Sequence, residues 1–163
     1  GTCPKEVGSP PTDLPHTGTN WAHLMTGHTF PCDGYLNAWQ YFRGNPNGNV
    51  YATIWRPIAK SQHQLIKKTL LPSDTAGIHT VALSQHVPIK QGDFIGIHYE
   101  AVSTEPIIPL AKDGDNALFA YDLYDTANIE RYNADLNEGN VVDLGIWSKK
   151  RVRFAIRAFL EGT

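Results

Sequence analysis

Short runs of alternating apolar and polar residues follow one another along the chain, and Gly, Asn, Asp or Pro separates them at intervals of about eight to twelve residues. In one of these runs Val50, Ala52 and Ile54 would share one face of a strand. The run 152–160 alternates in the same way. No segment shows the period and length of a stable helix. This rhythm is typical of sandwiches and barrels.

The alternation predicts an all-β fold, an antiparallel two-sheet sandwich of the jelly-roll type. Asn47-Gly48, between the runs 35–42 and 50–55, is a strong turn signal, so we expect these two runs to form a hairpin. Pro109 interrupts another run and predicts an edge strand. The expected strands lie at 35–42, 50–55, 64–71, 77–83, 94–99, 107–110 and 152–160.

The length of 163 residues fits a single domain, 1–163, with a Pro- and Gly-rich N-terminal arm over 1–20. The formal net charge of −2 argues against a basic nucleic-acid binder. No apolar run approaches the length of about 18 residues that a membrane helix needs, so we expect no membrane span. The first residues contain no apolar stretch of a signal peptide.

The only two cysteines, Cys3 and Cys32, lie in the N-terminal part of the chain. Their spacing does not suit zinc, which prefers close pairs. A disulfide between them would hold the arm against the domain and would indicate secretion into an extracellular, oxidising compartment. The alternative is two buried, reduced thiols in a cytosolic protein.

Acidic and aromatic residues gather in one loop-rich segment. Asp113-Gly114-Asp115-Asn116 places three oxygen-bearing side chains around a glycine, so Asp113 and Asp115 are candidate calcium ligands. An Asx-turn without an ion explains the same residues. Tyrosine beside Asn and Asp in loops also suits polar recognition. The predicted ligand-binding residues are Asp113, Asp115, Asn116, Tyr121, Asp122, Tyr124 and Asp125.

The remaining candidates for chemistry are weaker. The basic residues between 149 and 157 predict a solvated strand face, with a patch for sulphated glycans as the alternative. The seven histidines stand apart in the sequence, so we interpret most of them as half-exposed strand residues. No nucleophile elbow, phosphate loop or zinc-protease motif occurs, and no cofactor other than calcium is expected.

Four stretches resemble a family of secreted invertebrate β-sandwich modules found in extracellular, adhesive or lectin-like proteins. The resemblance covers about 32–100 and rests on strand, turn and core positions, so it implies fold and secretion and assigns no binding residues. The stretches are Cys32-Asp33-Gly34-Tyr35 through Trp39-Gln40-Tyr41-Phe42, Val50-Tyr51 through Ile54-Trp55-Arg56-Pro57, Ala76-Gly77-Ile78-His79-Thr80-Val81, and Gln91-Gly92-Asp93-Phe94-Ile95-Gly96.

These observations predict a secreted, non-catalytic, lectin-like domain whose partners are glycans or glycoproteins. Because single sugar sites are weak, we expect a homo-oligomer. One alternative is an extracellular matrix or adhesion module that binds protein, which a large exposed apolar patch would favour. The other is an enzyme whose site is assembled from distant strands, which a deep pocket with perturbed carboxylates or histidines would favour.

Overall fold

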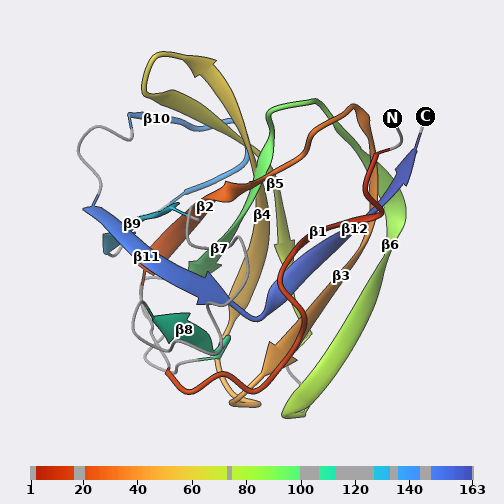
Figure 1. Cartoon of the computed structure of the whole chain (residues 1–163), viewed down its shortest axis with the longest axis vertical. Coiled ribbons are helices and arrows are strands. Elements are labelled where there is room, and N and C mark those ends of the chain that lie inside the picture. The colour runs from red at the N-terminus through yellow and green to blue at the C-terminus, as the bar shows by residue number, and fades with distance from the viewer. Residues whose placement is uncertain are drawn as a thin grey trace.

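A computed structural model gives the fold of the chain (Figure 1). All the regular secondary structure that it describes is β-strand, and all the strand pairs are antiparallel. The all-β antiparallel fold expected from the alternation is therefore confirmed. The described residues are 3–16, 21–72, 75–99, 107–112, 127–132, 136–143 and 148–162.

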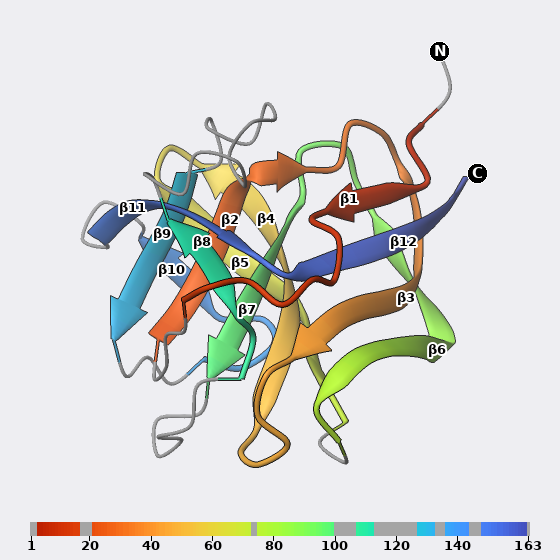
Figure 2. The same ribbon diagram turned by 60° about the horizontal axis from the view of Figure 1, so that its bottom comes forward.

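The strands form a small and a large sheet, and Figure 2 shows the four strands of the small sheet side by side. The small sheet has the order β1 (Glu6–Gly8), β12 (Ile156–Gly162), β3 (Gly34–Arg43) and β6 (Gly77–Ile89). The large sheet has the order β10 (Val141–Asp143), β5 (Gln62–Leu70), β4 (Val50–Ala59), β7 (Phe94–Tyr99), β2 (Trp21–Thr29), β9 (Ala127–Tyr132), β11 (Ser148–Phe154) and β8 (Leu110–Lys112). The jelly-roll connectivity stays a prediction.

The main hydrophobic core lies between the two sheets. From the small sheet, Trp39 and Tyr41 of β3 and Ile156 of β12 are fully buried in it. The face predicted for β4 is confirmed, because its alternate apolar residues point into this core. The large sheet contributes Val50, Ala52 and Ile54 from β4 and Ile95, Ile97 and Tyr99 from β7.

A second, smaller core covers the opposite face of the large sheet. Trp55 and Phe94 belong to it and pack with Leu136, which comes from the segment before β10. Lys68 Nζ donates to the carbonyl oxygen of Leu136 at 2.9 Å and so holds this segment over the sheet. Beside the indole of Trp55 the chain needs a glycine, since a Cβ at Gly96 would lie 3.1 Å from Trp55 Nε1 and 2.5 Å from a backbone oxygen of β2.

The prediction that the runs 35–42 and 50–55 form a hairpin is wrong, because the corresponding strands, β3 and β4, lie in different sheets. At the end of β3 the guanidinium of Arg43 is fully buried. It donates to the carbonyl oxygens of Asn47 at 3.3 Å, Gly48 at 2.6 Å and Pro72 at 3.1 Å. These bonds hold residues 44–49 as a crossover between the sheets, which a two-residue hairpin turn would not need.

The last alternating run is divided between two strands. β11 belongs to the large sheet and β12 to the small sheet, and the chain bends between them at Ala155. Ala155 N donates to the Pro109 carbonyl oxygen at 3.1 Å, and its own carbonyl accepts from Phe42 N at 3.0 Å. One continuous segment thus turns the corner between the sheets, as in orthogonally packed sandwiches.

The two lateral sides of the sandwich are built differently. On the side with β1 and β8, which we call the closed side, the N-terminal segment crosses from one sheet to the other. Ser9 N donates to the Ile156 carbonyl oxygen at 2.8 Å, and His16 and Leu110 exchange backbone hydrogen bonds of 3.0 and 2.8 Å. The open side is the opposite one, where β6 ends the small sheet and β5 and β10 end the large sheet.

The predicted disulfide between Cys3 and Cys32 is confirmed. The two Cα atoms are 6.0 Å apart, and neither cysteine is free. The bridge joins the segment before β1 to the turn between β2 and β3, so the N-terminal segment is tied covalently to the sandwich.

Candidate binding groove

The acidic, tyrosine-containing loop falls within residues 113–126, which lie outside the described residues. The calcium ligands and the glycan contacts proposed there therefore stay predictions. The residues concerned are Asp113, Asp115, Asn116, Tyr121, Asp122, Tyr124 and Asp125.

A groove of about 310 Å³ lies on the open side of the sandwich. One of its walls comes from β5 of the large sheet and the other from β6 of the small sheet, so it lies where the two sheets face each other at their edges. The lining residues are Lys67, Lys68, Thr69 and Leu70 on β5 and Leu83, Ser84, Gln85 and Val87 on β6.

An irregularity in β6 produces the second wall. β3 pairs Leu36 with Val87 and Ala38 with Ala82, so only one residue of β3 lies opposite residues 83–86 of β6. The extra residues of β6 have no counterpart on β3, and three of them line the groove. Such bulges commonly redirect side chains beside functional sites.

The polar groups of the groove differ in how they are satisfied. Lys68 is engaged elsewhere, because its ammonium donates to the Leu136 carbonyl and lies 4.4 Å from the ring centroid of Tyr51. Lys67 Nζ is 3.6 Å from Glu138 Oε1 in a pair that is about half exposed. The Thr69 hydroxyl is buried and has no hydrogen-bond partner among the described residues. An ordered water commonly satisfies such a buried group.

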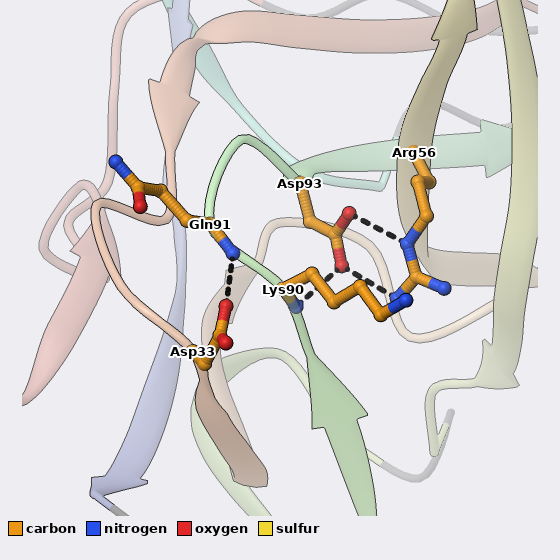
Figure 3. A network of polar contacts seen from close by, with 5 residues as sticks. All are labelled: Asp33, Arg56, Lys90, Gln91 and Asp93. Carbon is orange, nitrogen blue, oxygen red and sulfur yellow. Dashed lines mark hydrogen bonds and ion pairs between the residues drawn. The ribbon is translucent and has the colours of Figure 1, made fainter.

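A second polar cluster, drawn in Figure 3, stabilises the turn before β7. Asp93 is buried and accepts two bonds of 2.9 Å from the Arg56 guanidinium and another of 2.9 Å from Lys90 N. Nearby, Asp33 Oδ1 accepts from Gln91 N at 2.8 Å. The hydrogen bond to Asp93 raises the pKa of Arg56. Because both Asp93 oxygens are occupied, this cluster holds a turn.

Three histidines are buried, so the prediction of half-exposed strand residues is wrong for them: His23, His28 and His98. They lie on strands whose two faces are both covered, one by each core. The His23 ring centroid is 4.6 Å from that of Phe154. Burial, with a contribution from the positive charge of Arg153, lowers the pKa of His28 to about 4. This histidine is therefore neutral near pH 7.

Two features are absent from the described part of the chain. None of its elements is a helix with the length and apolar character needed to cross a membrane. Its His, Cys, Asp and Glu side chains form no group of three or more that could hold a metal ion. The candidate calcium ligands of the acidic loop lie outside this part.

Comparisons with known proteins give no relative from which a function could be transferred. No protein-family model matches the chain, no curated protein matches it, and no solved structure matches it. The resemblance to secreted invertebrate modules stays an expectation, and the function has to be argued from the chain's own residues.

Sequence reasoning missed the groove because its walls come from strands of different sheets. One signal was present: alternation on β6 stops at Ser84-Gln85-His86, where three polar residues follow one another. A break of this kind inside a strand indicates a bulge, and bulges often lie near sites. The opposite wall on β5 carries no comparable mark.

Proposed function

We propose that the chain is a secreted, non-catalytic carbohydrate-binding domain whose ligand occupies the groove between β5 and β6. The observation that carries the proposal is the chemistry of this groove. Hydrogen-bonding side chains from both walls surround a space of about 310 Å³, near the lower end of the usual range of about 300–1,000 Å³ for ligand sites.

The lining suits a sugar better than an apolar ligand. A sugar presents hydroxyl groups and a C–H surface, and binding must replace the water around the hydroxyls with protein donors and acceptors. Ser84 and Gln85 supply both donors and acceptors, and Lys67 supplies a cation. The aliphatic residues of the lining can cover the C–H surface; they are Leu70, Leu83 and Val87.

The same lining supports binding in preference to catalysis. Of the groups that serve in acid–base and nucleophilic steps, the described walls of the groove contain hydroxyls and lysines but no imidazole, carboxylate or thiol, the groups that most often act as the base. The disulfide between Cys3 and Cys32 supports secretion, since such bridges persist in oxidising compartments.

A glycan-array screen with calcium and with a chelator tests the proposal. For the glycan that binds best, Ser84→Ala and Gln85→Ala should each weaken binding about tenfold, because each removes hydrogen bonds to the ligand. Gln91→Ala, at an exposed position away from the groove, is the matched control for Gln85→Ala and should bind like the parent.

The same array separates the groove from the acidic loop. If Asp115→Asn or Asp122→Asn abolishes binding while both groove variants bind normally, the ligand site is the loop. If the parent binds no glycan at all, the carbohydrate proposal fails. The adhesion-module alternative then becomes the better one, and the apolar side chains exposed on the open side, Leu70 and Ile78, favour it.

A further inference from the structure

The four outermost strands of the two sheets differ sharply in length and charge. Three of them, β1, β8 and β10, are three residues long, and each contains one charged residue, namely Glu6, Lys112 and Asp143. The fourth, β6, has 13 residues and contains no Asp, Glu, Lys or Arg. Short length and charge are the usual means by which proteins prevent the pairing of exposed sheet edges. β6 uses neither.

The free edge of β6 also has an apolar, β-forming surface. β6 pairs with β3 on one side, and no described strand pairs with it on the other. Along its regular half, Gly77–Ala82, the exposed side chains are Ile78, Thr80 and Ala82, and Ile78 is 62% exposed. Ile and Thr have high strand propensity, so this half already has the conformation and the composition of an internal strand.

We propose that two copies of this chain associate by antiparallel pairing of β6 with β6 across a two-fold axis. A second copy fits this edge because pairing a strand with its own image is disfavoured where like charges meet, and β6 contains no Asp, Glu, Lys or Arg. With the axis at Thr80, each Ile78 lies opposite Ala82 of the other copy, and each His79 opposite Val81. The two small sheets then become one continuous sheet.

The pairing is confined to Ile78–Ala82, because the irregularity at residues 83–86 ends the regular strand and Gly77 would lie opposite Leu83. The groove residues on β6 follow this point, so the inference does not depend on what the groove binds. A contact of five residues from each copy is small compared with standard interfaces of about 1,600 Å². The dimer should therefore be weak and depend on protein concentration.

Sedimentation equilibrium of the full chain, from micromolar to submillimolar concentration, tests the proposal. The parent should show a monomer–dimer equilibrium. Thr80→Lys places two like charges opposite each other at the axis and should make the protein monomeric, as should Thr80→Glu. An equimolar mixture of these two variants should form dimers again, because opposite charges then face each other. Val141→Lys, at a half-exposed position on β10, is the control and should dimerise like the parent.

A parent that stays monomeric over the whole range overturns the proposal. So does a Thr80→Lys variant that dimerises like the parent, or a mixture of the two charge variants that stays monomeric. Thermal unfolding checks that the variants are folded. If Thr80→Lys is not folded, Ala82→Lys replaces it, since it puts a charge opposite Ile78; dimerisation of that variant at the parent's strength equally overturns the proposal.

Discussion

The closed and open sides of the sandwich are held by different kinds of bond. On the closed side, backbone groups of the N-terminal segment, of residues 107–110 and of the bend at Ala155 bond to one another. On the open side, the Pro72 carbonyl, which follows β5, accepts from the side chains of Tyr41 and Arg43, both at 3.1 Å. Backbone bonds survive most substitutions, whereas side-chain bonds do not.

The two sides also differ in the surfaces that the described residues form. On the closed side, His16 bonds to Leu110 of β8, and both outermost strands, β1 and β8, are three residues long. The open side has the groove and the long uncharged edge of β6. Its stability consequently depends on a few buried side chains near the crossovers between β3, β4, β5 and β6.

The largest expected effect comes from removing the main side-chain anchor of the open side. Arg43→Met should lower the free energy of unfolding by about 3–5 kcal/mol, because several carbonyl oxygens, including those of Gly48 and Pro72, lose the hydrogen bonds of a buried, charged donor. Urea unfolding measures it. Lys90→Met, at an exposed position, is the control. A loss no larger than that of the control would show that the open side does not depend on Arg43.

Removal of the disulfide tests how far backbone hydrogen bonds alone hold the closed side together. Replacing Cys3 and Cys32 together by Ser should cost about 3–4 kcal/mol, since the bridge closes a loop with a sequence separation of 29 residues. Because backbone bonds still hold the N-terminal segment, limited proteolysis at neutral pH should cut before residue 32 and leave the rest intact. Cleavage throughout the chain would mean that the closed side needs the bridge to stay assembled.

Acid should loosen the sandwich through His28. Its pKa falls from the ordinary 6.5 to about 4 on folding, so the unfolded chain takes up the proton first as the pH decreases. The contribution of neutral His28 to the free energy of unfolding is fully present above pH 6.5, and about 3 kcal/mol of it is lost as the pH falls to about 4. Urea unfolding across this range should show a smaller loss for His28→Gln. An unchanged pH profile in that variant would contradict the assignment.

The smallest effect isolates a single bond of the open side. Tyr41→Phe removes the hydroxyl that donates to the Pro72 carbonyl at 3.1 Å and keeps the buried ring. We expect a loss of about 1 kcal/mol, well below that for Arg43→Met, because the arginine still donates to the same oxygen. Thermal unfolding of Tyr41→Phe, Arg43→Met and the double variant gives the coupling energy between the two side chains. Equal losses for both single variants would refute this order.

Local patterns in the sequence predicted the features that depend on neighbouring residues. The face shared by Val50, Ala52 and Ile54 followed from alternation alone, and the limits of β7 are those of the run 94–99. The disulfide followed from the presence of only two cysteines. Features that depend on distant residues were missed. Nothing beside Asn47-Gly48 shows that Arg43 will hold that loop as a crossover between sheets.

The buried histidines and the groove failed to be predicted for a related reason. A histidine in an alternating run is expected to be exposed only if one face of its strand meets water. Around β2 and β7 the main core covers one face of the large sheet and the second core covers the other. The groove needs β5 and β6, which belong to different sheets, to be brought together. The predicted acidic loop remains an independent candidate, to be tested by its own variants.

The disulfide determines how the domain would respond to a pull on its two ends. Tension applied at the N-terminus passes from Cys3 directly to Cys32, so β1, the N-terminal segment and β2 are shielded from it. The force then acts on β3 and β12 at the end where Gly34 is paired with Gly162. Because both strands are pulled from the same end, their hydrogen bonds would open one after another. Reduction would lengthen the path and expose the shielded strands to the force.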